Sequence, residues 1–206
     1  MIWAIFAAFM TDDSHLPDAP VNQPVAIFDF DDTLVFADSM LHWQRWYARR
    51  RKLWLVALWV WFALLLRLLG KPAVWMKRAY MGTANRETPD SLKNLVRQFS
   101  REFLSQCGLT EMLERVWMHH SLGHKIVIVT ASPSFYLANL EDLLPPHELI
   151  ATELEFHGKQ VWNIPRLVGR NVKGTEKIQA LAYRGFVFPM TGSFAYSDHI
   201  SDAPLL

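Results

Sequence analysis

The stretch Val25-Ala26-Ile27-Phe28-Asp29-Phe30-Asp31-Asp32-Thr33-Leu34 is the most informative part of this chain of 206 residues. Its first four residues form a short apolar run, which predicts a buried β-strand. That strand would present Asp29 and Asp31 in the loop at its carboxyl end, where open α/β sheets bind ligands. A carboxylate there can attack phosphorus, and one two residues later points the same way and can handle a proton. The same acids also suit an ordinary surface turn, with Asp32 and Thr33 supplying the turn chemistry.

A second acidic pair lies near the C-terminus of the chain. The apolar run Phe194-Ala195-Tyr196 precedes Asp198 and Asp202, whose spacing of four lets them share one face of a turn. If this run is also a strand, its acids would meet Asp29 and Asp31 at the same edge of the sheet. Such an oxygen-rich cluster suits a hard cation such as Mg²⁺.

Two further segments offer groups that can bind an anion. The apolar, β-branched run at 125–129 ends in the hydroxyl residues Thr130 and Ser132, which can hydrogen-bond an anion at a helix N-terminus. The segment 169–178 places two lysines at the start of a predicted helix. Helix lysines are usually solvated, so their position alone does not make them functional.

In this order and at these spacings, the four segments resemble the motifs of the haloacid dehalogenase-like phosphohydrolases. The opening stretch resembles that superfamily's DxDGT signature, with Asp32 in the place usually held by glycine. Thr130 matches the second motif, a lysine the third, and Asp198 with Asp202 the fourth. The resemblance covers residues 25–206. Within the superfamily it is similar to the branch with a helical cap, which includes phosphoserine phosphatases and a bacterial phosphatidylglycerophosphate phosphatase.

The resemblance implies an α/β fold, in which a Rossmann-like, mostly parallel sheet has helices on both faces and an inserted all-helical cap. The implied phosphatase core is formed by 25–38 and 119–206, and the cap by 39–118. Residues 1–24 would be a flexible or apolar lead-in. A chain of this length can bury one such core.

Helical periodicity adds two predictions about local structure. The apolar spacing from Pro89 to Met118 predicts helices that return from the cap to the core. A further helix is predicted from Phe135 to Leu144, where Pro145 and Pro146 would end it.

The resemblance also assigns roles to the acids. Asp29 would be the nucleophile that takes the phosphoryl group, and Asp31 would protonate the leaving alcohol and then activate water against the aspartyl-phosphate. Asp29, Asp198 and the main-chain carbonyl of Asp31 would hold Mg²⁺, with Asp202 supporting the metal directly or through water. A carboxylate that attacks an anionic phosphate is repelled by it, and a cation and fixed donors relieve that repulsion. Thr130 and a lysine would be those donors.

Two lysines compete for the third motif. The pattern of the lipid-phosphatase relatives, aligned on Gly174, selects Lys177, whereas the pattern of phosphoserine phosphatases selects Lys173. The spacing Gly174-Thr175-Glu176-Lys177-Ile178 fits the first pattern throughout, so we expect Lys177 to be the catalytic lysine.

Basic and aromatic residues are concentrated in the predicted cap. Residues 39–86 contain no Asp or Glu, yet they hold 10 of the 21 Lys and Arg residues and six of the nine tryptophans. Inside this region, the basic-flanked segment 49–71 contains an uncharged run of 14 residues at 53–66. A helix needs roughly 20 apolar residues to cross a bilayer, so we expect this one to lie in or dip into the lipid interface.

Two alternatives to membrane contact remain for this segment, a buried cap helix and a dimer surface. The sequence leaves open whether 53–69 spans the membrane or lies on it. No nucleic acid is expected as a partner, because nucleic-acid surfaces combine basic residues with exposed aromatics rather than long aliphatic runs.

Three further features bear on where the protein works. Cys107 is the single cysteine, which excludes an internal disulfide and fits a reducing compartment. The first ten residues are apolar but make a poor signal peptide, because they lack a basic start and a cleavage-like end. The sequence stops four residues after Asp202, where relatives usually continue with a strand and a helix, so a truncated fragment of reduced stability is one expectation.

The functional prediction is therefore a Mg²⁺-dependent phosphomonoester hydrolase on the cytoplasmic side of the membrane. It would act on a phosphorylated lipid such as phosphatidylglycerophosphate, or on a small phosphorylated molecule. One alternative is a soluble, cytoplasmic enzyme of the phosphoserine phosphatase type, although a cap without acids offers no partner to an amino-acid ammonium. Another is a catalytically idle membrane-bound relative, against which the retention of all six motif residues argues. The cap selects the substrate in this superfamily, so the motifs do not identify it.

Overall fold

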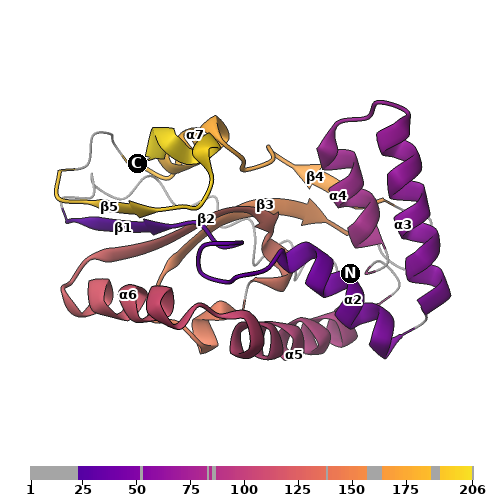
Figure 1. Cartoon of the computed structure of the whole chain (residues 1–206), viewed down its shortest axis with the longest axis horizontal. Helices are drawn as coiled ribbons and strands as arrows, with labels where there is room; N and C mark the ends of the chain where they lie inside the picture. The colour runs from indigo at the N-terminus through magenta and orange to yellow at the C-terminus, as the bar shows by residue number, and fades with distance from the viewer. Residues whose placement is uncertain are drawn as a thin grey trace.

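The computed structural model describes residues 23–51, 53–82, 84, 87–137, 139–156, 164–186 and 191–205 (Figure 1). Most of the predicted lead-in at 1–24 lies outside these ranges. The described part combines one sheet with helices on both of its faces.

Five strands form this sheet in the order β4-β3-β2-β1-β5. β1 lies in the sheet between β2 and β5 and is parallel to both, with Phe28 opposite Ile128 and Tyr196. β3 is parallel to β2, and β4 pairs with β3 in the antiparallel direction. The predicted Rossmann-like, mostly parallel sheet is confirmed, and it brings the carboxyl ends of β1, β2 and β5 side by side. The strands are β1 (Val25–Phe28), β2 (Lys125–Pro133), β3 (Glu148–Glu155), β4 (Arg166–Val168) and β5 (Phe194–Tyr196).

Alternating side chains of the central strands enter two separate hydrophobic layers, as the two-residue period of a strand requires. Ala26 and Phe28 belong to the larger layer, and Val25 and Ile27 to the smaller one, where they join Leu181 of α7 (Thr175–Tyr183). α5 and α6 cover the face opposite to α7 (Figure 1). Because both faces are covered, β1 is buried along its whole length.

Three helices are inserted directly after the first motif. The first of them, α2 (Ser39–Arg50), begins at Asp38, whose carboxylate accepts a hydrogen bond from the Leu41 amide at 2.9 Å. α3 (Leu53–Leu68) packs on α4 (Ala73–Met81), and α4 lies between α3 and β4 in the view of Figure 1. The insertion therefore extends to one side of the sheet.

Trp43 holds α2 against the rest of the protein. Its fully buried indole stacks on Tyr47 of the same helix and on Tyr136, and it meets Phe99 and Phe135 edge to face. Buried aromatic side chains of this size dominate the energy of a core. This cluster fixes the start of α2 close to the carboxyl ends of the strands.

The predicted helical spacing from Pro89 to Met118 is confirmed and is divided between two helices. α5 (Pro89–Cys107) starts at Thr88 and stops at Gly108, and α6 (Thr110–Ser121) follows and packs on β2. A Cβ at Gly108 would lie 2.5 Å from the Leu104 carbonyl oxygen, so glycine is needed for this close approach. The domain bounds expected from the sequence stay a prediction.

The predicted helix from Phe135 to Leu144 is wrong. In its place the described residues form two short 3₁₀ turns, η2 (Ser134–Tyr136) and η3 (Leu140–Asp142). The Tyr136 carbonyl accepts a hydrogen bond from Ser100 Oγ at 2.7 Å, and the Leu140 amide donates to Leu137 instead. The Tyr136 carbonyl thus takes part in a tertiary hydrogen bond, and the Leu140 amide closes a 3₁₀-type turn instead of an α-helical one.

α3 has 16 residues. Within the described ranges, no helix combines the length and the apolar character that a membrane span requires.

Candidate active site

A buried lysine joins two of the predicted site acids. Lys177 is only 2% exposed, and its Nζ lies 2.7 Å from Asp29 Oδ2 and also donates a hydrogen bond to Asp202 Oδ2. Asp29 follows β1, Lys177 lies in the first turn of α7, and Asp202 lies in η4 (Ile200–Leu205). Three segments that are far apart in the sequence therefore meet at one ammonium group.

Local backbone geometry explains how these side chains reach one another. The Asp29 amide donates to the Tyr196 carbonyl at 2.9 Å, which extends the pairing of β1 with β5 by one residue. The Phe30 amide donates to Asp29 Oδ1 at 2.7 Å, and the other carboxylate oxygen, Oδ2, contacts Lys177. Gly174 has φ of 59° directly before α7, a conformation that glycine adopts readily, and it turns the chain so that Lys177 enters the interior.

The two carboxylates on Lys177 differ in their pKa values. Burial raises the pKa of Asp29 to about 6, and the nearby Lys177 ammonium offsets only part of this effect. Burial also disfavours the charged form of Asp202, but hydrogen bonds from Lys177 and Ser197 outweigh it and lower the pKa of Asp202. Asp202 therefore stays charged and holds the lysine, whereas Asp29 is the less well solvated carboxylate.

Asp31 lies in a network of hydroxyl groups. Its Oδ1 accepts from the Ser39 amide at 2.8 Å, and its Oδ2 accepts from Ser132 Oγ. Ser39 Oγ in turn lies 3.1 Å from Ser132 Oγ and 3.0 Å from Tyr136 Oη. Sequence reasoning did not single out Ser39 and Tyr136, because a lone serine at a helix start and a lone tyrosine carry no spacing signal.

This environment changes the proton affinity of Asp31. Burial raises its pKa, and the hydrogen bonds from Ser132 and Ser39 pull it back only partly. A carboxyl group with a raised pKa keeps its proton to a higher pH than a free carboxyl group, which suits a residue that must both give and take a proton in general acid and base catalysis.

Thr33 connects the first motif to the fourth. Its buried Oγ1 accepts from the Asp198 amide at 3.1 Å and lies 3.4 Å from Asp198 Oδ1. Between Asp31 and Thr33, Asp32 has φ of 55°, a left-handed conformation that Asn and Asp tolerate better than other side-chain residues. This explains how Asp32 can occupy the position where the resembled signature has glycine.

Thr130 lies on β2, next to the end of β1. It is buried, and its Oγ1 accepts a hydrogen bond from the Ser132 amide at 3.0 Å. Phe28 pairs with Ile128, so Thr130 is two residues beyond the last β1 partner in the register. The structure thus places the second-motif hydroxyl at the sheet edge that also carries Asp29, and its role stays a prediction.

The donor set at this edge suits a hard cation in its chemistry. Asp29 and the exposed Asp198 follow two adjacent parallel strands, and Asp31, in the loop that follows β1, offers a main-chain carbonyl. In the described parts of the chain, no group of three or more His, Cys, Asp or Glu side chains is arranged to hold a metal. Asp202 binds Lys177, so its predicted place in the metal shell stays untested.

A cap residue also reaches this region. Lys77 of α4 donates hydrogen bonds to the Ala131 carbonyl and, at 2.6 Å, to Asn171 Oδ1. Asn171 also accepts from Thr152 Oγ1 at 3.3 Å. Sequence reasoning missed Lys77 and Asn171, and a lone lysine in a basic cap carries no signal that would have identified it.

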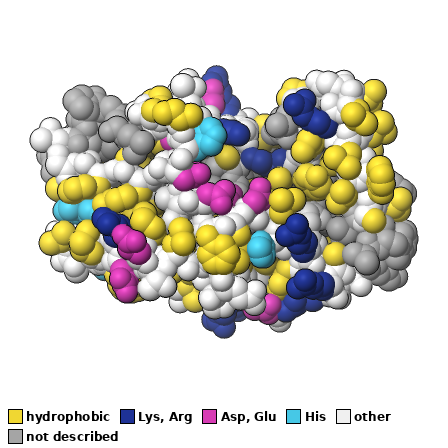
Figure 2. Space-filling view, viewed as in Figure 1, with side chains coloured by type: hydrophobic (Ala, Val, Ile, Leu, Met, Phe, Trp, Pro, Cys, Tyr) yellow, Lys and Arg dark blue, Asp and Glu magenta, His cyan; other side chains and the backbone are white. Residues whose placement is uncertain are grey.

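Acidic and hydrophobic side chains occupy different parts of one face of the molecule. Figure 2 shows acidic side chains gathered near the middle of this face, over the segment that connects β1 to α2. Hydrophobic side chains cover much of α3 and α4 on the right of the same view. The acidic side chains near the middle therefore lie beside the hydrophobic side chains of α3 and α4 in this view.

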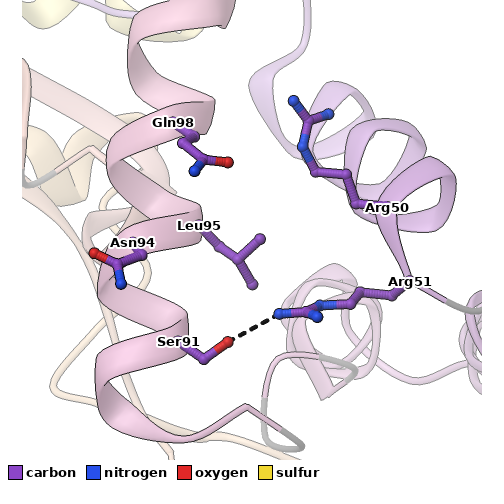
Figure 3. Close-up of a pocket in the computed structure, with 6 residues that line it drawn as sticks. All are labelled: Arg50, Arg51, Ser91, Asn94, Leu95 and Gln98. Atoms are coloured by element: carbon purple, nitrogen blue, oxygen red, sulfur yellow. Dashed lines mark hydrogen bonds between the residues drawn. The ribbon is translucent and has the colours of Figure 1, made fainter.

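A cavity of about 340 Å³ lies elsewhere, between the end of α2 and the start of α5 (Figure 3). Arg51 Nη2 donates to Ser91 Oγ across it at 2.9 Å, and Arg50 and Arg51 form ion pairs with Glu102 and Glu87. Because its cations already have acidic partners and it contains none of the site residues, we assign it no catalytic role.

Comparisons with known proteins agree with this geometry. A family model described as haloacid dehalogenase-like hydrolase matches residues 26–206. No curated protein matches the sequence.

Solved structures share the fold. A protein of unknown function from Bordetella pertussis Tohama I superimposes with a TM-score of 0.67 at 24% identity, over 89% of this chain and 85% of its own. A phosphoserine phosphohydrolase-like protein from Francisella tularensis superimposes with a TM-score of 0.56 at 17% identity, over 88% of this chain and 81% of its own. A probable phosphoserine phosphatase from Vibrio cholerae superimposes with a TM-score of 0.57 at 13% identity, over 91% of this chain and 55% of its own.

Proposed function

Because the chain belongs to the haloacid dehalogenase-like hydrolases, we propose that it hydrolyses phosphomonoesters with the help of Mg²⁺ and through an aspartyl-phosphate. The observation that carries the proposal is the buried contact of 2.7 Å between Lys177 Nζ and Asp29 Oδ2, with Asp31 two residues later in a network of hydroxyl groups. It supplies a nucleophile, a fixed cation and a proton carrier at one edge of the sheet.

The proposed reaction has two steps. In the first, Asp29 Oδ2 attacks phosphorus, the bond from phosphorus to the leaving oxygen breaks, and Asp31 gives its proton to that oxygen. In the second, a water molecule gives a proton to Asp31 while its oxygen bonds to phosphorus and releases Asp29. Asp31 thus ends the cycle protonated, as it began.

Charge stabilisation is divided among fixed groups. The Lys177 ammonium, held in place by Asp202, would face the phosphoryl oxygens, and the Thr130 hydroxyl would donate to them from the neighbouring strand. Asp29, Asp198 and the Asp31 carbonyl would hold Mg²⁺, with Asp202 in support, and the ion would neutralise charge on the phosphate. The buried Lys177 needs little rearrangement when the phosphoryl group arrives, because its carboxylate partners already fix its position.

The finer proposal concerns the substrate, a phosphorylated lipid such as phosphatidylglycerophosphate at a membrane surface. Its support is the outer side of α3, where several large apolar side chains are exposed, with Trp61 at 71% and Leu68 at 85%. Contiguous exposed apolar surface of this kind marks an interaction site. The exposed apolar residues of this segment include Leu58, Trp61, Leu64, Leu65, Leu68 and Leu69.

The charges around α3 favour an anionic bilayer as the occupant of this surface. Three arginines precede the helix, at positions 49, 50 and 51. Arg67 lies in its last turn and Lys71 follows it, and residues 39–86 contain no Asp or Glu. Basic residues beside an apolar helix attract anionic lipid headgroups. α4 packs against α3 and sends Lys77 toward the active site, so a headgroup bound beside α3 would need to pass only one helix to reach it.

A soluble enzyme acting on phosphoserine is the alternative function. Two neighbours of the same fold are titled phosphoserine phosphohydrolase-like and probable phosphoserine phosphatase, and their identities of 17% and 13% support the fold alone. The absence of acids at 39–86 leaves the cap insertion without a partner for a substrate ammonium. We therefore favour the lipid phosphate, and a catalytically idle relative would release no phosphate at all.

The test is a phosphate-release assay with Mg²⁺ on phosphatidylglycerophosphate in mixed micelles and on soluble 4-nitrophenyl phosphate. We expect release from both, a higher rate on micelles, and loss of release with EDTA. Asp29→Asn should abolish release, whereas Asp32→Asn in the same loop should retain it, because Asp32 is exposed and Asn tolerates its φ of 55°. Wild-type release by the Asp29→Asn variant would overturn the mechanism, and equal rates on both substrates would overturn the lipid preference.

A further inference from the structure

Lys77 of α4 contacts two segments next to the site residues, one at the end of β2 and one before α7. Its ammonium donates to the carbonyl of Ala131, the residue after Thr130, and to the side chain of Asn171, which precedes the lysines of the third motif. The helix that carries it contains no acidic residue. Lys77 is half-buried, so its charge lies between the cap and the core rather than in bulk water.

The position of Lys77 relative to Asp31 identifies the side of the site that it serves. The Lys77 ammonium binds the Ala131 carbonyl, and the next residue, Ser132, donates its hydroxyl to Asp31 Oδ2. Asp31 gives its proton to the leaving oxygen in the proposed mechanism. A cation of the cap that binds next to the partner of Asp31 therefore lies on the leaving-group side. Lys177 contacts Asp29 instead, and in the proposed mechanism it faces the transferred phosphoryl group.

An ammonium group has three N–H donors. In the described part of the chain, Lys77 uses two of them, on the Ala131 carbonyl and on Asn171 Oδ1. The third donor is available to a ligand. Its charged surroundings are Asp31, Asp38 and Lys173, of which Asp31 is bound by Ser39 and Ser132 and Asp38 accepts from the Leu41 amide.

From this geometry, and resting on the proposed function, we propose that Lys77 binds an anionic group on the leaving-group part of the substrate. The substrate class is then a phosphomonoester whose alcohol carries a second negative charge, such as a carboxylate or a phosphodiester. The phosphodiester of phosphatidylglycerophosphate is one such anion. Lys77 and Lys173 repel a cationic group at the same place, and Asp31 and Asp38 offset only part of that repulsion because their carboxylates already accept hydrogen bonds.

Three small esters that differ at one group test this inference. The leaving alcohol of glycerol 3-phosphate is uncharged. In 3-phosphoglycerate a carboxylate replaces its terminal hydroxymethyl group, and in O-phosphoserine an ammonium also replaces the 2-hydroxyl group. We expect kcat/KM for 3-phosphoglycerate to exceed the value for each of the other two by at least tenfold. A hydrogen bond between charged groups accounts for a ratio of this size.

Substitution of the lysine provides the decisive comparison. Lys77→Gln should reduce the ratio of 3-phosphoglycerate to glycerol 3-phosphate at least tenfold, mainly through a higher KM, and Lys77→Arg should keep most of it. Arg78→Gln is the matched control, because Arg78 is the next cation of α4 and its Nε donates to the Pro165 carbonyl at 2.6 Å. It should leave the ratio unchanged. Thermal melts of all three variants report whether they fold.

The outcomes separate this inference from the proposed function. A wild-type enzyme that hydrolyses all three esters with equal kcat/KM overturns the role of Lys77 and leaves the phosphatase proposal standing. A Lys77→Gln variant that folds and loses activity equally on all esters also overturns it, because the residue then only supports the cap. A wild-type enzyme that releases no phosphate from any ester or lipid overturns both.

Discussion

Replacement of Lys177 by methionine tests the central electrostatic contact of the structure. Lys177 is 2% exposed and neutralises Asp29 and Asp202, so Lys177→Met leaves two carboxylates in a dry site without a cation. Removing one partner of a buried ion pair costs about 3–5 kcal/mol of folding free energy. A protein of this size loses about 2–4 °C of Tm per kcal/mol, so the expected loss is roughly 6–20 °C.

The assay is thermal unfolding at pH 7 in EDTA, so that no metal ion replaces the missing charge. Lys173→Met is the matched control, because Lys173 is exposed and precedes α7 by only a few residues. Its free energy of unfolding should change by less than about 0.5 kcal/mol. The same pair decides which lysine serves the third motif, since Lys177→Met alone should also abolish phosphate release.

A second substitution separates lost charge from lost packing. Adding Asp202→Asn to Lys177→Met removes one of the two stranded carboxylates, so the double variant should melt above the single one. The reasoning is refuted if Lys177→Met melts within 1 °C of the wild type, or if Lys173→Met is the more damaging change.

Three other predictions follow from the described contacts. Trp61→Glu on α3 should weaken binding to vesicles of anionic lipid at least tenfold in a flotation assay. Trp117→Glu, at a 51% exposed position of α6, should not weaken it. Equal binding by both variants would contradict the proposal that α3 contacts the membrane. Gly108→Ala places a Cβ 2.5 Å from the Leu104 carbonyl oxygen and should lower the free energy of unfolding by about 1–3 kcal/mol in urea titrations, and an unchanged midpoint would show that the helix end is not constrained there. Burial lowers the pKa of Lys77 to about 8, so its charge is lost as the pH rises above 8. The KM of the wild type for 3-phosphoglycerate should therefore rise with pH, whereas the KM of Lys77→Arg should stay flat. Parallel pH profiles would argue against Lys77 as the group that binds the anion.

The parts of the fold that the sequence predicted best are those with strong local patterns. The run before Asp29 is a buried strand, and the parallel pairing of β1 with β2 and β5 follows from apolar runs that each end in polar residues. The covering of both sheet faces by helices is also confirmed. These features depend on hydrophobic periodicity, which a single sequence displays directly.

The failures come from interactions between distant segments. The segment at 135–144 has helical spacing, but in the structure the Tyr136 carbonyl accepts from Ser100 Oγ and the Leu140 amide donates to the Leu137 carbonyl. The first of these contacts spans 36 residues, and no local pattern reports it.

The candidate site shows the same division. The motif spacing identified Asp29, and the structure adds its contact with Lys177. The Ser39 and Tyr136 hydroxyls and the ammonium of Lys77 were missed, because each is a single residue brought in by the packing of another element. Sequence patterns thus predicted the acids of the candidate site, whose roles stay a prediction, whereas the single residues that contact them required coordinates.

The most direct test of the account is to look for the phosphoryl group on Asp29. Enzyme mixed with substrate and Mg²⁺ is quenched in acid within one turnover, digested, and analysed by mass spectrometry. The account predicts that the peptide containing Asp29 gains one phosphoryl group, that fragmentation places it on Asp29, and that Asp29→Asn shows none. Phosphorylation of a different residue, or turnover by the Asp29→Asn protein at the wild-type rate, would contradict it.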